Sequence, residues 1–430
     1  MSDFAPLSVP EATDAPEAFG FVPCPGGVCA ASGITAAGVH AGFRKDPHRL
    51  DLALVAAEKP CVAAGTFTTN RFCAAPVQVS RAHVADGRAQ AVVLNSGNAN
   101  AATGEPGLAT ARRTAELVAS TLGCEPTDVL VASTGVIGPP LPWEPFETGV
   151  PAVAALCAAT TDAAHDAACA VMTTDTYSKE VSYAGEVAAA DGGAYTVHVG
   201  GFVKGSGMIQ PNMATMLCVL TTDASLTAEA AATALRAAVK STFNKVTVDS
   251  DTSTNDTAVL LATGEAALAG EKIDLASPAY PAVAAALKGC CSELARKIAA
   301  DGEGSTKLVT VNVLGAATDA DADTVARAIA NSPLVKTAIF GHDANWGRVA
   351  AAAGKCGVAF DQTNVDIDFM GVPVCRAGLT VPMDEDDMLR RFEAPEIDVT
   401  ISLGEGHAHT RVWTCDLTHD YVTINGDYRT

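Results

Sequence analysis

The sequence predicts an α/β protein in which helices and strands alternate along the chain. Apolar residues recur about every 3.6 positions in several long stretches, which is the pattern of helices with one buried face. Between them lie short stretches rich in Val and Ile, which favour strands. With 430 residues, of which 48% are hydrophobic, the chain can bury a large core, and its length suggests two or three lobes.

Five stretches are expected to be helical, at residues 107–122, 150–169, 227–242, 280–300 and 318–331. The fourth carries Leu287, Leu294 and Ile298 at helical spacing. Thr227 is a suitable N-cap for the third helix. Glu229 adds an acid to the first turn of that helix, where the backbone amides are unpaired.

Seven stretches are expected to be strands, at residues 91–95, 128–132, 215–221, 308–314, 365–369, 398–403 and 422–425. No internal repeat is evident in the sequence. A dinucleotide-binding fold is not supported, because KGSGMI at 204–209 keeps only the first two glycines of the G-x-G-x-x-G pattern.

The charge of the chain restricts its partners. It carries 28 basic and 49 acidic residues, a net charge of −21, which argues against binding to nucleic acid or to an anionic membrane surface. No uncharged apolar run reaches the length of about 18 residues that a membrane span needs, and the N-terminus lacks the pattern of a signal peptide. We expect a soluble cytoplasmic protein whose partners are small molecules and copies of itself.

Thirteen cysteines are scattered through the sequence, and free thiols are the favoured interpretation in a chain without export signals. Cys24 and Cys29 have no matching second pair, and Cys290 and Cys291 are neighbours in a predicted helix, where adjacent side chains diverge. We therefore expect no zinc site.

Two other metal patterns are also weak. Residues 249–260 begin like a calcium loop, but the sixth position is Thr254 instead of Gly and the twelfth is Leu260 instead of Glu. His407 and His409 could share one face of a strand, but no third ligand is nearby, so surface positions are favoured. No metal or organic cofactor is expected.

The most informative segment is KGSGMIQPNMATMLCVL, at residues 204–220. Cleavage between Ala214 and Thr215 would give chains of 214 and 216 residues and would leave a hydroxyl and a free α-amine on Thr215. This amine, with a pKa of about 8, can serve as the base for the hydroxyl. Gly205 and Pro211 favour the bent backbone that an N-to-O acyl shift requires. The alternative is a Gly/Pro-rich loop followed by an ordinary buried strand.

The sequence around this segment resembles the ornithine acetyltransferase family of arginine biosynthesis, whose bifunctional members also make N-acetylglutamate. The likeness covers nearly the whole chain. It is carried by KGSGMIQPNMATML itself and by AAGTFTTNRFCAAPV, LNSGNANAATGEPG, ASTGVIG and MTTDT before it. After it come VTVDSDTSTNDT, DGEGSTKL, FGHDANWGR and WTCDLTHDYVTINGDYRT.

The resemblance implies a layered helix/sheet/sheet/helix fold of the self-processing N-terminal-nucleophile type. Residues 1–214 would be the α chain, and residues 215–430 would be the β chain, with Thr215 at its N-terminus. The two halves would form one intertwined catalytic unit and assemble as an α2β2 heterotetramer.

The resemblance also implies the roles of individual residues. Thr215 would be the nucleophile. The Thr134 hydroxyl and the Gly135 backbone N–H would form an oxyanion hole, a role in which one lost donor costs about 10²–10³ in rate. Without the resemblance, the segment around Thr134 would be interpreted as a turn that ends a strand.

The implied substrate-binding residues are Thr173, Lys204, Thr215, Glu303, Asn425 and Thr430. Lys204 could bind a carboxylate and Glu303 an ammonium group, although solvated surface charge is the usual role of such residues. The sequence does not settle whether Thr173 or Thr174 faces the site.

We therefore expect an acetyltransferase that takes acetyl from N²-acetyl-L-ornithine onto Thr215 and passes it to L-glutamate. The sequence does not distinguish members that also accept acetyl-CoA. Two alternatives remain at this point. One is an amidase or aminopeptidase of the same type that passes the acyl group to water, and the other is a binding protein that keeps the fold without cutting itself.

Overall fold

The computed structural model describes residues 4–10, 15–189, 192–210, 216–266 and 271–427. These residues form two compact units. The large unit falls within residues 13–244 and 252–298, and the small unit within residues 1–12, 245–251 and 299–429. The committed residues Ala214, Thr215 and Thr430 lie outside the described residues.

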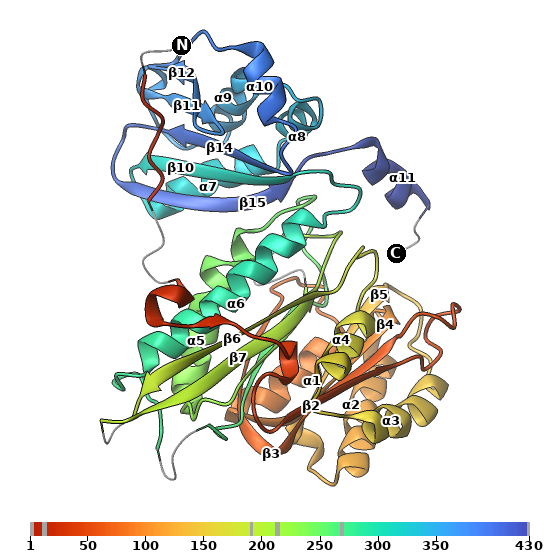
Figure 1. Cartoon of the computed structure of the whole chain (residues 1–430). Helices are drawn as coiled ribbons and strands as arrows, with labels where there is room; N and C mark the ends of the chain where they lie inside the picture. Colours follow the sequence, from red (N-terminus) through yellow and green to blue (C-terminus); the bar gives the residue numbers. More distant parts are fainter. Residues whose placement is uncertain (1–3, 11–14, 190–191, 211–215, 267–270, 428–430) are drawn as a thin grey trace. The chain divides into compact units, whose positions relative to one another are not determined.

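The large unit is built on a sheet of nine strands (Figure 1). The strand order is β1-β6-β7-β8-β9-β3-β4-β5, and β2 also pairs with β3. The strands are β1 (Val22–Pro23), β2 (Ile34–Val39), β3 (Leu52–Phe67), β4 (Arg88–Asn98), β5 (Val129–Val136), β6 (Lys179–Ala188), β7 (Ala194–Lys204), β8 (Leu217–Thr222) and β9 (Thr257–Ala262).

The long strand β3 joins two halves of this sheet. Its pairing with β4 shifts register between Ala56 and Cys61, and from Val62 onward it also pairs with β9. Val55 of β3 and Leu94 of β4 share one buried core with Val219 of β8 and Val259 of β9. The two halves of the sheet therefore pack face to face around a common core.

Helices cover the outer faces of both halves (Figure 1). On the side of β3, β4 and β5, a second core contains residues of α1 (Ala75–His83), α2 (Gly104–Leu122) and α3 (Glu144–Leu156). On the other side lie α5 (Ala228–Ser241) and α6 (Tyr280–Ala300). In α6, Cys290 Sγ donates to the Val199 carbonyl of β7 at 3.7 Å. The predicted helix/sheet/sheet/helix layering is confirmed in this unit.

The small unit contains a six-stranded sheet in the order β13-β12-β11-β14-β10-β15. Its strands are β10 (Leu308–Ala316), β11 (Asp366–Phe369), β12 (Val372–Arg376), β13 (Leu379–Thr380), β14 (Glu396–Ser402) and β15 (Ala408–Cys415). Its helices are α7 (Asp319–Ala330), α8 (Pro333–Phe340), α9 (Trp346–Gly354), α10 (Glu385–Arg391) and α11 (His419–Asp427). Residues of β10, β11, β14, α7 and α9 share its core.

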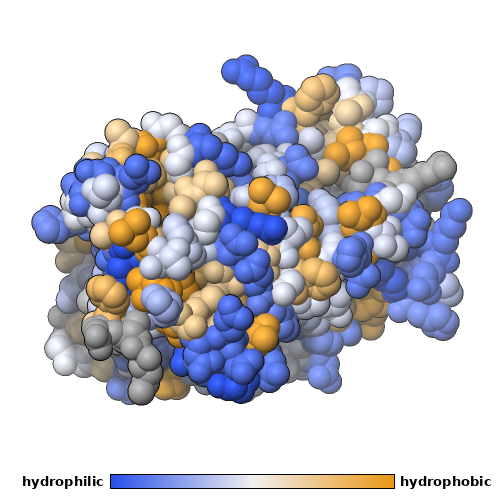
Figure 2. Space-filling view, turned by 90° about the horizontal axis from the view of Figure 1, so that it is seen from above, coloured by the Kyte–Doolittle hydropathy of each residue, from blue (hydrophilic) through white to orange (hydrophobic). Residues whose placement is uncertain are grey.

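Short 3₁₀ helices complete the described structure. They are η1 (Pro16–Phe19), η2 (Gly27–Cys29), η3 (Val84–Asp86), η4 (Pro126–Asp128), η5 (Phe243–Lys245) and η6 (Gln362–Asn364). Apolar side chains are interspersed with polar ones on the face shown in Figure 2. In the ranges that the structure describes, no helix is both long enough and apolar enough to cross a membrane.

Four of the five predicted helices form close to the expected residues, and the helix at Tyr280–Ala300 has the predicted bounds. Thr227 caps α5 as expected, since its hydroxyl accepts from Ala230 N at 3.2 Å. Six of the predicted strands are also confirmed in their described parts. The strand predicted at 215–221 is β8, whose described residues begin at Leu217.

The single helix predicted over 150–169 is wrong. The chain leaves α3 after Leu156 and starts α4 (Thr161–Ala170) after a break. In the break, Ala158 exchanges two backbone hydrogen bonds with Ala36 of β2. Thr160 then caps α4 by accepting from Ala163 N at 3.2 Å. The helical period continued through the break because apolar residues there face the same core.

The strand predicted over 422–425 is also wrong, because these residues lie in α11. The run of Val422, Thr423 and Ile424 favours a strand locally. In the structure, Thr423 instead donates to the His419 carbonyl one helical turn earlier, at 3.3 Å. Val422 is mostly exposed, so burial in a sheet does not reward its β-branched shape.

Candidate functional site

The predicted oxyanion residues lie where β4 and β5 end side by side. These two strands run parallel, with Ser96 beside Thr134 and Gly97 beside Gly135, and a bulge follows at Asn98. Gly135 has φ of +130°, and a Cβ placed there would lie 2.3 Å from the carbonyl carbon of Gly97. Only glycine fits this crossing, which gives a physical reason for the glycines in the segments LNSGNAN and ASTGVIG.

The structure brings Lys204 to the same place. Lys204 is the last residue of β7, and its Nζ donates to Thr134 Oγ1 at 3.4 Å. Its side chain is only 8% exposed, so this is not the solvated surface lysine that the alternative interpretation described. A buried ammonium, a hydroxyl and a backbone N–H thus lie around one short stretch of chain.

A buried carboxylate, Asp175, completes this cluster. Its Oδ1 accepts from Lys179 Nζ at 2.7 Å and from Gly205 N at 2.7 Å, and its Oδ2 accepts from Thr173 N at 2.9 Å. Burial alone would raise the pKa of Asp175, but the positive charges of Lys179 and Lys204 hold that pKa well below its usual range. Asp175 is therefore an anion that fixes the end of β7.

Sequence reasoning did not assign a role to Asp175, although it stands in the quoted segment MTTDT. Its signal was the lysine four residues later, since an Asp–Lys pair in a largely uncharged stretch predicts a buried partner for each. This pair has both side chains fully buried.

The predicted substrate residue Thr173 lies in the segment before Asp175. It is half-buried, and its hydroxyl donates to Asp175 Oδ2 at 3.5 Å. Two arginines hold the backbone here. Arg44 Nη2 donates to the Met172 carbonyl at 2.6 Å, and Arg49 Nη2 donates to the Thr173 carbonyl at 3.0 Å. Thr174 is half-buried as well, so burial does not decide between the two threonines.

The segment before β9 also reaches these strand ends. Asn255 Nδ2 donates to the Ala99 carbonyl at 2.6 Å and to the Ser133 carbonyl at 2.8 Å. Nearby, Thr257 N donates to the Met216 carbonyl at 2.9 Å, just before β8. Sequence reasoning quoted this segment without giving Asn255 a role.

The expected nucleophile Thr215 and its neighbour Ala214 are outside the described residues. The described chain resumes at Met216, and β8 begins at Leu217, which pairs with Lys204 of β7. Strand β8 lies between β7 and β9 in the sheet.

Two further predicted substrate residues meet in the small unit. Asn425 Nδ2, on α11, donates to Glu303 Oε2 at 2.7 Å. Glu303 is 9% exposed and lies between α6 and β10, and the neighbouring Gly304 carbonyl accepts from Thr418 at 2.6 Å. Burial and the carboxylates of Asp249, Glu303 and Asp251 raise the pKa of Tyr421. This part of the unit is thus strongly electronegative. Thr430, the last predicted residue, lies outside the described part.

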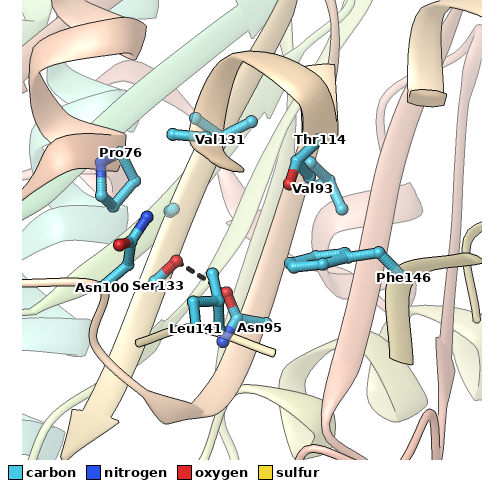
Figure 3. Close-up of a pocket in the computed structure, with 11 residues that line it drawn as sticks. Pro76, Val93, Asn95, Asn100, Thr114, Val131, Ser133, Leu141 and Phe146 are labelled. Atoms are coloured by element: carbon cyan, nitrogen blue, oxygen red, sulfur yellow. Dashed lines mark hydrogen bonds between the residues drawn. The ribbon is translucent and has the colours of Figure 1, made fainter. Parts of the chain in front are cut away.

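A small polar cavity lies at the strand ends of the large unit (Figure 3). It has a volume of about 10 Å³, the size of one water molecule, and its polar lining includes Asn95, Asn100, Thr114 and Ser133. An amino acid cannot enter so small a space, so the cavity supports the turn and is not a substrate site.

The arrangement in the large unit suits acyl transfer. A hydroxyl, a backbone N–H and a buried ammonium are the groups that stabilise negative charge on a carbonyl oxygen. In the described ranges, no three His, Cys, Asp or Glu side chains converge to hold a metal ion.

Known proteins were compared with the chain over its whole length. Residues 35–430 match the ArgJ family. A crystal structure of arginine biosynthesis bifunctional protein ArgJ from Bacillus halodurans aligns with 49% of this chain and 98% of its own, at 39% identity and a TM-score of 0.47. The protein of that name from Symbiobacterium thermophilum is 49% identical over 407 residues, which cover 94% of this chain and 99% of the relative. The one from Nitratidesulfovibrio vulgaris is 45% identical over 403 residues, covering 92% and 98%. The family match and these identities show that the chain belongs to the ArgJ family.

Proposed function

We propose that this protein is a glutamate N-acetyltransferase of arginine biosynthesis, which moves the acetyl group of N²-acetyl-L-ornithine to L-glutamate. Membership of the ArgJ family supports the reaction class. The observation that carries the proposal is the position of Lys204, Thr134 and Gly135, which lie together at the strand ends beside the start of β8.

In the first half of the reaction, the Thr215 hydroxyl attacks the acetyl carbonyl of N²-acetylornithine and passes its proton to the Thr215 α-amine. The oxygen of the tetrahedral intermediate accepts hydrogen bonds from the Thr134 hydroxyl and the Gly135 N–H. The C–N bond then breaks, the α-ammonium returns a proton to the leaving amine, and ornithine departs. An acetyl ester remains on Thr215.

In the second half, the amine of glutamate attacks this ester through the same intermediate, and N-acetylglutamate leaves as the Thr215 oxygen regains its proton. Lys204 would bind the substrate carboxylate, and Thr173 would contribute a hydroxyl. Glu303 and Asn425, which are hydrogen-bonded to each other, would recognise the amino-acid part of the substrate together with Thr430.

The same chemistry would produce the nucleophile. Attack of Thr215 on the preceding peptide carbonyl would cut the chain into residues 1–214 and 215–430. Strands β8 and β9 come after this bond and lie in the sheet between β7 and β3, which come before it. This order supports the proposal that both halves remain one catalytic unit and that two such units form an α2β2 assembly in the cytoplasm.

The relatives are named bifunctional, which favours a second activity in which acetyl-CoA replaces N²-acetylornithine as the acetyl donor to glutamate. Steady formation of N-acetylglutamate from acetyl-CoA and glutamate, without ornithine, would show this activity. A rate that does not exceed the uncatalysed rate would contradict it.

The decisive experiment is an intact-mass measurement of the denatured protein, before and after incubation with N²-acetylornithine alone. We expect two chains that end and begin at Ala214 and Thr215, with one acetyl group gained by the second chain and lost on addition of glutamate. An uncut chain that never gains acetyl would overturn the assignment of Thr215. Loss of acetyl at the same rate without glutamate would favour an amidase that transfers to water.

A further inference from the structure

We infer that Asn255 is a positioning residue for acetyl transfer, which holds the Thr134–Gly135 turn where its donors meet the developing oxyanion. This inference rests on the function proposed above. Asn255 does not itself contact the reacting atoms in this scheme. It acts through two backbone carbonyls, one directly before the turn and one in the adjacent loop after β4.

The hydrogen bonds of Asn255 use the full capacity of its side-chain amide. Its two N–H groups are directed at the Ala99 and Ser133 carbonyls, at 2.6 and 2.8 Å. Its Oδ1 accepts from the Thr254 hydroxyl at 2.6 Å. Asn255 is 5% exposed, so water does not compete well for these bonds. The amide therefore links two loops that the sequence separates by more than thirty residues.

The turn needs such a link because of its place in the sheet. Strand β5 is the last strand in the described order, and its pairing with β4 becomes irregular at Gly97 and Asn98, beside Thr134 and Gly135. Regular backbone pairing therefore ends where the proposed oxyanion donors begin. Side-chain hydrogen bonds from outside the β4–β5 pair take over at this point.

Asn95 holds the same residue of the turn from a second direction. Its Oδ1 accepts from the Ser133 hydroxyl at 2.6 Å, the bond drawn in Figure 3, and its Nδ2 donates to the Asn98 carbonyl at 3.0 Å. Ser133 is thus fixed through its hydroxyl by Asn95 and through its carbonyl by Asn255. The next two residues are the proposed oxyanion donors.

Small displacements of such donors are costly. Catalytic groups need to be held within about 0.5 Å of the productive geometry, and a misplacement of about 1 Å can cost about 10²-fold in rate. Asn255→Asp keeps the shape of the side chain but turns an acceptor oxygen toward a carbonyl that now lies at hydrogen-bond distance. Repulsion between these oxygens would push the Ser133 carbonyl, and the turn after it, away from its position.

The test is a double-mutant cycle in the full chain, with rates expressed per Thr215 site that can be acetylated, as counted by intact mass. We expect Asn255→Asp to lower kcat for transfer from N²-acetylornithine to glutamate by about 10²-fold, with KM for both substrates within about threefold. When it is combined with Thr134→Ala, the total loss should fall short of the product of the two single losses by at least about tenfold. Losses that simply multiply would overturn the inference.

Asn312→Asp is the matched control. Asn312 is a buried amide of the small unit, 3% exposed, that bonds Thr400 and Arg411. Its loss of stability should leave kcat within about threefold, and any effect should multiply with that of Thr134→Ala.

If Asn255→Asp does not fold, Asn255→Ser replaces it. A serine hydroxyl can donate to only one of the two carbonyls, so the same shortfall is expected at a smaller loss of kcat. A rise in KM with unchanged kcat in either variant would contradict a positioning role. A wild-type protein that takes up no acetyl would instead refute the proposed function, and the two failures are therefore distinguishable.

Discussion

The two regions that hold the predicted site residues are built differently. In the large unit, Lys204 and Thr134 lie at the ends of strands, and Asp175 fixes their surroundings with hydrogen bonds to a buried lysine and to two backbone amides. In the small unit, Glu303 and Asn425 lie on a loop and on the helix near the chain end, joined by one hydrogen bond. Groups that would act on the reacting carbonyl are thus held rigidly, whereas groups that would recognise the amino acid can adjust.

The two regions also differ in their electrostatics. The carboxylate of Asp175 is paired with a buried ammonium, so the charges of the large-unit cluster balance internally. The carboxylate of Glu303 is held by an amide, and other carboxylates lie near enough to raise the pKa of Tyr421. The second region is therefore suited to attract a positively charged group, as the δ-ammonium of ornithine would be.

The largest expected effect is that of Asp175→Asn on stability. The change leaves Lys179, which is 1% exposed, and Lys204 without their buried counter-charge. We expect the free energy of unfolding to fall by about 3–5 kcal/mol, measured by urea denaturation. Glu303→Gln is the control, because it removes a buried carboxylate that an amide holds, and it should cost about 1 kcal/mol. Equal losses for both variants would remove the contrast between the regions.

Next is Gly135→Ala, which forces a Cβ against the backbone of Gly97. The turn must move, so we expect kcat for acetyl transfer to fall by about 10²-fold or more. Gly138→Ala is the matched control, since Gly138 also has a positive φ, of +103°, but nothing lies within 4 Å of its Cβ position. Steady-state kinetics should show little change for Gly138→Ala. Similar losses in both variants would mean that backbone strain alone, and not the crossing with Gly97, explains the effect.

A smaller effect is expected for Asn425→Ala, which removes the hydrogen bond to Glu303. Loss of one such bond costs about 1.4 kcal/mol, so KM for N²-acetylornithine should rise about tenfold while kcat stays within about threefold. Thr423→Ala, an exposed position on the same helix, should leave both constants unchanged. A fall in kcat at constant KM would show that α11 helps to build the reacting geometry.

The smallest effect is the pH dependence of the Asp175 contribution. Because the folded pKa of Asp175 is held below its ordinary value of 3.8, its charge stabilises the fold above about pH 4 and this stabilisation is lost as the pH falls below that value. The difference in unfolding free energy between the wild type and Asp175→Asn should therefore narrow between about pH 5 and pH 3. A constant difference across this range would contradict the charged state assigned to Asp175.

Much of the fold was predictable because its long elements carry regular patterns. The amphipathic period of α6 predicted both of its ends, and the Val-rich runs of β10 and β14 predicted central strands. The errors arose where tertiary contacts override the local pattern. The break between α3 and α4 depends on a bridge to Ala36, more than a hundred residues earlier, and no local pattern reports it.

The candidate site was predictable only in part, for a related reason. Motifs identified Thr134, Gly135, Lys204, Glu303 and Asn425, and the structure brings the first three together and the last two together. Asp175 and Asn255 were missed because their roles depend on backbone groups of distant segments. A carboxylate that accepts from Gly205 N, or an amide that donates to the Ser133 carbonyl, leaves no spacing signal in the sequence.

The strand order of the large unit has a consequence for the life of the protein after cutting. Strands β8 and β9 are inserted between β7 and β3, and β7 pairs with β8 from Val199↔Thr222 to Lys204↔Leu217. Pulling the two fragments apart would tear the sheet along two seams and leave raw edges on each piece, which readily pair with other chains and aggregate. The nick would therefore act as a one-way ratchet: the pieces stay associated for as long as the enzyme stays folded, and once separated they do not find each other again.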